Sequence, residues 1–378
     1  MHLTVAAALI LNELGEVLCV KRGASKFQST AFKWEFPGGK IESGETPAQA
    51  VVREVTEELA ISVEAIADGP CVEHTYSEFS ITLQSVLCVQ VNHELPQLRE
   101  HIDLKWCAPD ALWQLDFAAA DIPLVNYLRE KTFGALLKTK TFGRYSHFLS
   151  DCTSTNDELL KLAEAGAPEG TLVVSEIQSK GRGRLGRTWL SEPGQGLLFS
   201  FLARPTLPPE VAATLSLVAG LAVALTLREL GCPAGVKWPN DILIDDRKVC
   251  GILCEAQTSA RGIEGIIIGI GINTGIVPEL VAYRAISVSG ADDRLTLLAK
   301  VLQCFECLYA RWSREGLKAL RAELDACDCK VGKEITVKLS DTPTVGLSRG
   351  IRDDGALLLE TVDGEITPIV CGEIVQWD

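Results

Sequence analysis

A short stretch rich in glycine and arginine, residues 181–189 (GRGRLGRTW), combines two residue types that suit an anionic ligand. Glycine lets the backbone approach a ligand closely, and arginine supplies a positive charge that does not titrate. The chain carries a formal net charge of -14, so this cationic loop is a local feature. A nucleic-acid surface would need a broader basic patch. We therefore expect the loop to bind a nucleotide phosphate or a carboxylate; a solvated basic loop is the alternative.

Three further fragments carry polar side chains suited to a small ligand. Residues 153–156 (TSTN) precede an expected helix, although capping of that helix alone would explain them. Residues 237–242 (KWPNDI) combine a cation, an aromatic ring and two oxygen ligands, and Lys248 follows them. Residues 269–273 (GIGIN) place two glycines beside an amide, although such a pair is often only a tight turn. Each fragment alone is weak evidence for a ligand site. Their order and spacing make the combined evidence stronger.

An acidic helix face near the N-terminus is the second candidate site. Residues 46–49 (TPAQ) have the signature of a helix start with a capping box. On that helix Glu54, Glu57 and Glu58 lie three or four residues apart and share one face. Three such carboxylates repel one another unless a cation lies among them, and Mg²⁺ takes oxygen ligands of this kind. An ordinary solvated acidic face is the alternative, and the glycine-rich loop before the helix argues against it.

The N-terminal segment resembles the Nudix box. Gly39, Glu45 and residues 53–58 (REVTEE) have the spacing of that motif, and residues 34–39 (WEFPGG) are similar to its MutT-type branch. Members of that branch hydrolyse nucleoside triphosphates, oxidised ones in particular. The resemblance covers about residues 1–131 and implies an α/β/α sandwich. It also implies a Mg²⁺-dependent cleavage of the nucleotide to a nucleoside monophosphate and pyrophosphate.

The Nudix resemblance implies roles at the matching positions. The implied Mg²⁺ ligands are Gly39, Glu54, Glu57 and Glu58, the implied catalytic residues are Glu54, Glu57 and Glu100, and the implied nucleotide contacts are Arg22 and Asp121. Arg53 would orient one of the carboxylates. Asp121 does not decide which nucleotide base is preferred. A protonated carboxyl group could bind an oxidised purine, whereas a carboxylate could accept a hydrogen bond from the amine of a cytosine-type base.

Ala60 departs from the Nudix pattern, which usually has glycine there. The position ends the helix, where glycine eases a left-handed turn. Alanine costs about 1 kcal/mol if that conformation is retained. The carboxylates are intact, so we expect activity to survive.

The motifs of the second half resemble the catalytic domain of biotin–protein ligases of the BirA type, and GRGRLGRTW and KWPND are the specific ones. The resemblance runs from about residue 146 to the end of the chain. It implies a two-step reaction on the substrates biotin and ATP, with Mg²⁺. The biotin carboxylate attacks the α-phosphate of ATP to give biotinyl-adenylate, which an acceptor lysine then attacks. The implied acceptor is the biotin carboxyl carrier domain of acetyl-CoA carboxylase or of a similar carboxylase.

The same resemblance implies the ligase site residues. Biotin contacts are implied for Ser154, Thr155, Asn156, Gln178, Gly181, Arg182, Gly183, Arg184 and Lys237. Nucleotide contacts are implied for Arg187, Trp189, Asn240, Lys248 and Asn273. The catalytic residues would be Lys237, Arg184 and Arg187, since fixed cations near two reacting anions stabilise charge that develops on phosphorus. Trp189 as an ordinary core residue remains an alternative.

These motifs divide the chain into four expected parts of a multidomain α/β (α+β) protein. They are a Nudix domain (1–131), a linker (132–145), a class II synthetase-like ligase domain (146–328) and a small SH3-like β-barrel (329–378). Turn signals at residues 353–355 and 363–364 indicate the short strands of the barrel.

Composition narrows the function classes. The acidic balance argues against binding to DNA or to a membrane surface, and we expect neither a helix-turn-helix nor a repressor role. No signal-peptide pattern and no uncharged apolar run long enough to span a bilayer are found, so a cytoplasmic protein is expected. The 13 cysteines are scattered through apolar runs, which favours core packing over metal or redox chemistry, including at Cys304 and Cys307. A homodimer is left open.

Two functions therefore compete. The first is a bifunctional enzyme that joins biotin to an acceptor lysine and hydrolyses nucleoside triphosphates, oxidised purine or cytosine types. The alternative is a biotin ligase whose Nudix module senses a nucleotide without hydrolysing it.

Overall fold

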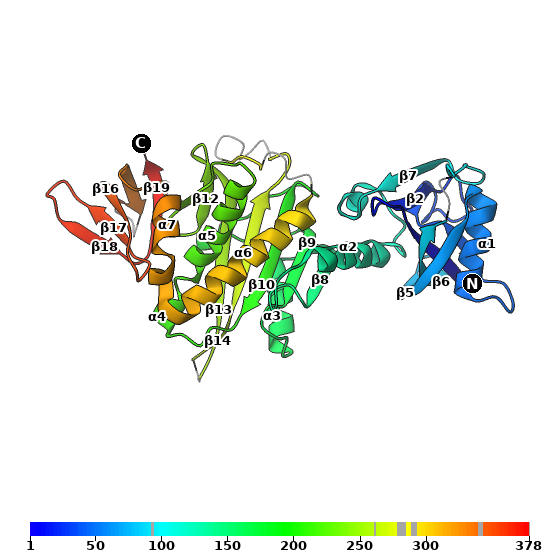
Figure 1. Cartoon of the computed structure of the whole chain (residues 1–378), viewed down its shortest axis with the longest axis horizontal. Helices are drawn as coiled ribbons and strands as arrows, with labels where there is room; N and C mark the ends of the chain where they lie inside the picture. The colour runs from blue at the N-terminus through cyan, green and yellow to red at the C-terminus, as the bar shows by residue number, and fades with distance from the viewer. Residues whose placement is uncertain (92–93, 261, 278–284, 289–292, 339–342, 378) are drawn as a thin grey trace. The chain divides into compact units, whose positions relative to one another are not determined.

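The protein is described by a computed structural model covering residues 1–91, 94–260, 262–277, 285–288, 293–338 and 343–377 (Figure 1). The chain divides into two compact units, Met1–Thr132 and Phe133–Asp378. Both are mixed α/β structures, as the sequence predicted.

The first unit is a sheet with a helix against each face. Its strands are β1 (His2–Leu11), β2 (Val17–Lys21), β3 (Trp34–Glu35), β4 (Gly38–Lys40), β5 (Val63–Thr75), β6 (Ser80–Gln90) and β7 (Asp103–Cys107). The order is β3-β2-β1-β6-β5, with β4 paired to β1 and β7 to β2. The helices are α1 (Pro47–Leu59) and α2 (Ile122–Leu136), with a short 3₁₀ helix, Pro109–Gln114.

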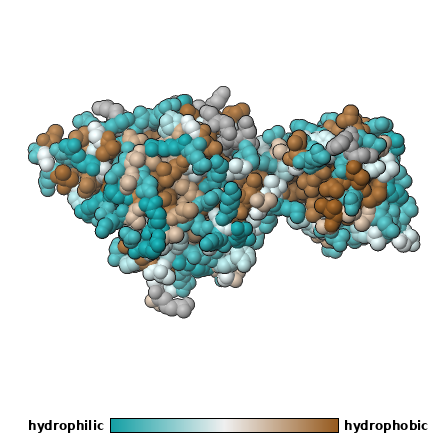
Figure 2. All heavy atoms as spheres, in the orientation of Figure 1, coloured by the Kyte–Doolittle hydropathy of each residue, from teal (hydrophilic) through white to brown (hydrophobic). Residues whose placement is uncertain are grey.

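Alternation along β1 explains the two layers of this unit. Ala6, Ala8 and Ile10 pack in one core with Val51 and Val55 of α1. Ala7 and Leu9 point the other way and pack with Leu124 and Leu128 of α2. Successive strand residues face opposite sides of a sheet, so one strand contributes to both cores. This confirms the expected α/β/α sandwich. Figure 2 also shows hydrophobic residues gathered on the displayed face of the first unit.

The second unit contains a seven-stranded sheet in the order β11-β12-β13-β14-β10-β9-β8. These strands are β8 (Ser146–Cys152), β9 (Leu172–Gln178), β10 (Gly196–Ala203), β11 (Gly235–Lys237), β12 (Asp241–Ile244), β13 (Arg247–Ser259) and β14 (Gly262–Asn273). The helices are α3 (Thr155–Glu164), α4 (Pro209–Ala212), α5 (Leu215–Glu229), α6 (Arg294–Glu315) and α7 (Arg321–Cys327), with 3₁₀ helices at Arg184–Gly186 and Gly316–Leu320. Helices α5 and α6 lie against one face of the sheet (Figure 1), and α3 packs on the other.

A five-stranded antiparallel sheet ends the second unit, in the order β18-β17-β16-β15-β19. Its strands are β15 (Glu334–Lys338), β16 (Pro343–Ile351), β17 (Leu357–Glu360), β18 (Ile366–Ile369) and β19 (Glu373–Trp377). Gly355 and Gly364 turn the chain with positive φ angles of 84° and 77°. Both positions lie in the turns that the sequence indicated.

The expected linker at 132–145 requires correction. Helix α2 continues to Leu136, and the chain divides between Thr132 and Phe133. Phe133, Leu137 and Phe142 are buried in the main core of the second unit. The basic residues of this segment hid the apolar side chains that anchor it, so most of the segment is part of the second unit.

One apolar stretch of the second unit bears on the expectation about membranes. Residues Pro209–Glu229 are long and apolar enough to cross a membrane by length and composition. Most of this stretch is buried inside the second unit, where a core helix passes the same test. All 13 cysteines are free thiols, and Cys19, Cys88 and Cys250 are buried in apolar cores as expected. Cys304 is only partly buried and Cys307 is exposed, so the expectation of core packing is wrong for Cys307.

Candidate active sites

The second unit has a small pocket over the central strands of its sheet. Its lining contains most of the residues that the motifs singled out there: Ser154, Thr155, Asn156, Gln178, Arg182, Gly183, Arg184, Trp189, Asn240 and Lys248, with parts of β13 and β14. Gly181 borders this group, because a Cβ there would lie 2.7 Å from the Trp189 carbonyl oxygen.

A hydrogen-bond network holds the polar floor of this pocket. The Gln178 side-chain oxygen accepts from the Thr155 amide (2.7 Å) and from its hydroxyl (3.2 Å). Ser200 donates to Thr155 Oγ1 (2.7 Å) and to Asn156 Oδ1 (2.6 Å). Gly269 approaches Asn156 so closely that a Cβ would lie 2.2 Å from its oxygen. These side chains are therefore fixed in place, whereas simple capping is not observed: Ser154, the cap residue of α3, makes no side-chain capping bond.

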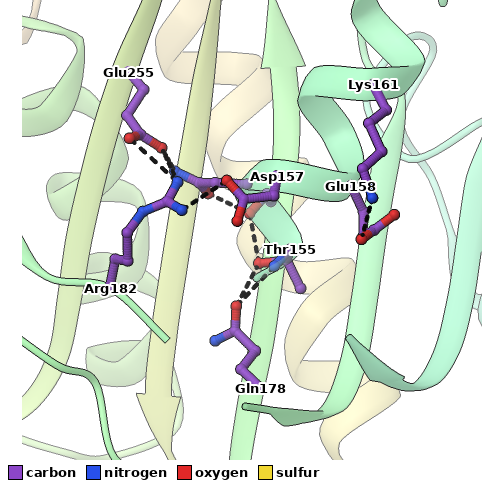
Figure 3. Close-up of polar contacts among 9 residues, drawn as sticks. Thr155, Asp157, Glu158, Lys161, Gln178, Arg182 and Glu255 are labelled. Atoms are coloured by element: carbon purple, nitrogen blue, oxygen red, sulfur yellow. Dashed lines mark hydrogen bonds and ion pairs between the residues drawn. The ribbon is translucent and has the colours of Figure 1, made fainter. Parts of the chain in front are cut away.

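The arginines of the glycine-rich loop are paired with acidic or amide groups. Arg182 lies between two carboxylates (Figure 3), with NH1 2.6 Å from Asp157 Oδ1 and NH2 3.1 Å from Glu255 Oε2. Arg184 donates to Asn240 Oδ1 over 3.2 Å. The loop is thus tied to α3 and to the β13 region through its cations, which is the opposite of a freely solvated basic loop.

A larger cavity of about 860 Å³ adjoins the first pocket. Trp189 and Lys248 line both, and Arg187, Lys237, Asp241 and Asn273 line only the larger one. Lys237 Nζ is 2.9 Å from Asp241 Oδ2, and Lys248 Nζ is 2.6 Å from Asp241 Oδ1. Burial alone would raise the pKa of Asp241, but the two ammonium groups hold that pKa below its ordinary value. Asp241 therefore stays ionised and gathers two cations at one wall.

Trp189 forms the partition between the two cavities. A Cβ on Gly271 would lie 2.6 Å from its ring, and one on Gly251 would lie 2.9 Å from it. Lys248 Nζ lies 5.6 Å from the ring centroid. The buried indole nitrogen has no hydrogen-bond partner. Trp189 is thus a wall of the site, and two glycines make room for it.

The first unit places the acidic helix face as the capping signature predicted. Thr46 and Gln49 form the capping box of α1. Arg53 pairs with Glu45 (2.9 Å), with Glu54 (2.9 Å) and with Glu57 (3.4 Å). Arg53 therefore offsets the repulsion within the acidic face.

Gly39 lies directly against this face. A Cβ there would lie 2.3 Å from the Glu54 carboxylate. A side chain at position 39 would therefore require the Glu54 carboxylate to move.

Glu58 is the buried member of the acidic face. Burial and the nearby charges of Glu54, Glu35 and Glu100 raise its pKa to about 7, although His101 acts in the opposite direction. Its Oε2 is buried without a hydrogen-bond partner. Glu100 itself is exposed. An orphaned carboxylate oxygen beside other acids is a position where a divalent cation would fit.

The predicted Mg²⁺ ligands do not form one compact group. Within the described ranges, the structure has no set of three or more histidine, cysteine or acidic residues arranged to hold a metal. Arg53 pairs with Glu54 and Glu57, and the Glu57 side chain is 60% exposed. Glu58 is buried instead. The residue types fit Mg²⁺, and their carboxylates would have to turn toward a common point.

The implied nucleotide contacts of the first unit lie around Glu35. Arg22 binds Glu35 Oε2 over 2.7 Å, and His101 Nε2 lies 3.1 Å from Glu35 Oε1. Asp121 is buried and accepts from the Phe36 amide over 3.1 Å. Burial first, and then the charge of Glu35, raise the pKa of Asp121 to about 8.

Three comparisons place both units among known proteins. Residues 149–273 match the biotin/lipoate A/B protein ligase family, and residues 330–377 match the biotin protein ligase C terminal domain. The bifunctional ligase/repressor BirA of Bacillus subtilis is 35% identical over 237 residues, which are 60% of this chain and 73% of that protein. The chain belongs to the biotin protein ligase family.

The N-terminal unit has its own relatives. Residues 1–128 match the NUDIX domain model. The CTP pyrophosphohydrolase of Escherichia coli is 36% identical over 136 residues, covering 33% of this chain and 91% of that protein. A NUDIX domain therefore precedes the ligase domains.

The ligase fold is shared with a solved structure. The biotin protein ligase from Aquifex aeolicus, in complex with biotin and ATP, is 31% identical, with a TM-score of 0.54. It covers 62% of this chain, and this chain covers 99% of it.

Several residues of the ligase site were missed from the sequence. Glu373 and Trp377 of the C-terminal barrel line the larger cavity, and Arg187 NH1 lies 2.6 Å from Glu373 Oε1. Ser200 and Glu255 join the polar floor through Asn156. The arginine and Glu373 lie 186 residues apart, so no local spacing could have indicated the pair.

Proposed function

We propose that the chain is a bifunctional enzyme. The ligase domains would attach biotin to an acceptor lysine through biotinyl-5'-AMP, and the NUDIX domain would hydrolyse nucleoside triphosphates. The observation that carries the ligase half is the pair of adjoining cavities. One has a fixed floor of amide and hydroxyl groups, and the other has a wall of cations, with Trp189 between them. The Aquifex aeolicus ligase, whose complex contains biotin and ATP, supports this assignment.

The two cavities suit the two halves of the first step. Thr155, Asn156 and Gln178 offer donors and acceptors to the ureido ring of biotin. The biotin carboxylate would then reach past Trp189 to Lys237, which lines the larger cavity. Its oxygen attacks the α-phosphorus of ATP, the bond to the β-phosphate oxygen breaks, and pyrophosphate leaves.

Fixed cations lower the barrier of that step. Asp241 holds Lys237 and Lys248 before substrate arrives, so little reorganisation is needed as charge develops on phosphorus. Arg187 and Arg184 would serve the phosphates and the adenylate, and Asn240 and Asn273 the nucleotide side. Mg²⁺ would neutralise the phosphate oxygens when bound.

The second step needs no nucleophile from this chain. The acceptor lysine, on a biotin carboxyl carrier domain, attacks the carbonyl carbon of biotinyl-5'-AMP. AMP leaves with the bonding electrons, and the lysine nitrogen loses a proton. The same cations stabilise the leaving phosphate.

The test of the ligase half is direct biotin transfer. The protein is mixed with biotin, ATP, Mg²⁺ and an acceptor domain, and the acceptor is analysed by mass spectrometry for biotin on lysine. The expected product is a singly biotinylated acceptor, strongly reduced with Lys237→Ala. No transfer by the parent would overturn the assignment.

The hydrolytic half is supported by the acidic face. Gly39, Glu54, Glu57 and Glu58 would hold Mg²⁺, and Glu54, Glu57 and Glu100 would serve the attacking water. Arg22 would bind phosphate and Asp121 would meet the base. A raised pKa near 8 makes Asp121 a hydrogen-bond donor at neutral pH, which suits an oxidised purine. The Escherichia coli relative is a CTP pyrophosphohydrolase, which supports a cytosine-type base.

A panel of nucleoside triphosphates separates these possibilities. CTP, dCTP, 8-oxo-dGTP and dGTP are each incubated with the protein and Mg²⁺, and monophosphate is measured. Hydrolysis that disappears with Glu57→Gln and Glu58→Gln supports the enzyme. Nucleotide binding without turnover would support the alternative, a nucleotide-sensing module.

A further inference from the structure

Strand β19 of the C-terminal barrel reaches the cationic wall of the ligase site. Glu373, Ile374, Val375 and Trp377 all line the larger cavity. Glu373 binds Arg187, and the Trp377 ring faces Lys237, with the Lys237 Nζ 5.2 Å from the ring centroid. Two cations of the proposed reaction therefore have a partner on this one strand.

The Trp377 ring also contacts a lysine of the barrel that is anchored to the catalytic domain. Lys330 Nζ lies 4.0 Å from its centroid. Lys330 is completely buried and binds Asp246 over 2.6 Å, in the turn between β12 and β13. Because an ammonium is attracted to the face of an aromatic ring, the anchored Lys330 fixes the indole.

The indole of Trp377 holds Lys237 without neutralising the charge of its ammonium group. Lys237 is 5% exposed, and Asp241 accepts one of its three N–H bonds. The ring attracts the ammonium without accepting a classical hydrogen bond and without cancelling its charge. A second carboxylate would hold Lys237 equally well but would neutralise it.

We propose that Trp377 is a positioning residue for Lys237: it holds the ammonium in place from the barrel side while leaving its remaining N–H bonds for the two anionic substrates. The inference rests on the proposed ligase function. It assigns to the barrel a direct part in adenylate formation, through one aromatic side chain.

The kinetic test compares Trp377→Leu with Trp377→Phe in the full chain. Biotin-dependent exchange of pyrophosphate into ATP is measured, with kcat and the KM values for ATP and biotin. Trp377→Leu should lower kcat about tenfold, and Trp377→Phe should recover most of it, because phenylalanine keeps an aromatic face. The KM for biotin should rise less than kcat falls, since Lys237 would meet only the carboxylate of biotin and Trp377 does not line the pocket proposed for the ring. Gln376→Ala, on the exposed side of β19, is the matched control and should behave like the parent.

A second readout does not depend on ligase activity. Lysines are acylated with acetic anhydride and followed by peptide mass spectrometry. Lys237 should react several-fold faster in Trp377→Leu than in the parent, whereas Lys248 should be unchanged. Equal Lys237 labelling in the parent and both variants would overturn the inference, as would a Phe variant no better than the Leu variant. If the parent shows no exchange but Lys237 labelling responds as expected, the ligase function fails and the contact stands.

Discussion

The two candidate sites use charge in opposite ways. In the ligase domain, Asp241 holds Lys237 and Lys248 at one wall, and glycines shape the space around Trp189. In the NUDIX domain, Arg53 pairs with Glu54 and Glu57, and Glu58 is buried close enough to Glu54 for the two charges to interact. The first site is built by packing and is formed in the protein alone. The second is a set of residue types whose common focus would be the cation they bind.

The largest expected effect tests whether the two sites work separately. Lys237→Ala should lower adenylate formation about 10³-fold, because it removes a fixed cation from the reacting phosphate. Nucleotide hydrolysis by the same preparation should stay within twofold of the parent. Both rates are measured on one sample, by pyrophosphate exchange and by monophosphate release. A parallel loss of hydrolysis would mean that the sites are coupled.

The converse variant is expected to act on the other site alone. Glu57→Gln removes a charge from the acidic face and should lower hydrolysis on the order of 100-fold. Biotin transfer to the acceptor should not change. Titration with Mg²⁺ should require a higher concentration for the residual activity. An unaltered Mg²⁺ requirement would exclude Glu57 as a ligand.

Adding a single methyl group at Gly271 should disturb the ligase site. Gly271→Ala would place a Cβ 2.6 Å from the Trp189 ring, so the ring must move. We expect the KM for biotin or for ATP to rise about tenfold, because small displacements in a positioned site are costly. Steady-state exchange kinetics measure this. Parent-like constants would show that Trp189 is free to move.

The stability of the NUDIX domain should depend on pH. Burial raises the pKa of Glu58 to about 7 and that of Asp121 to about 8, so the folded protein holds protons that the unfolded chain has released. Stability of the NUDIX domain should therefore fall by several kcal/mol between about pH 4 and 8. Pulse proteolysis in urea, read from peptides of residues 1–132, measures it. Asp121→Asn should flatten part of the slope; an equally steep slope would remove Asp121 from the explanation.

The smallest effect concerns the end of helix α1. Ala60 adopts the left-handed conformation, with φ 55° and ψ 33°. The sequence alone did not establish that this conformation is retained at Ala60. Ala60→Gly should stabilise the NUDIX domain by about 1 kcal/mol and leave both activities unchanged. The same urea experiment detects this as a shift of the midpoint, and a lower midpoint would contradict it.

The sequence by itself determined the features that depend on residues close together in the chain. The capping box at Thr46, the shared face of Glu54, Glu57 and Glu58, and the barrel turns at Gly355 and Gly364 depend on residues within a few positions of one another. The motifs for the two families are also local strings. Helix periodicity and turn chemistry act over such distances, which is why these elements could be predicted.

Tertiary structure decided which groups meet. It brought Ser200 and Glu255 to Asn156, Glu373 to Arg187 and Trp377 to Lys237, across separations that no spacing rule covers. It also placed Phe133 and Phe142 in a core, where the sequence suggested a linker. A contact between distant segments depends on how whole sheets and helices pack, and a buried group's pKa depends on what surrounds it. Neither the contact nor the pKa can be inferred from residues close in the sequence.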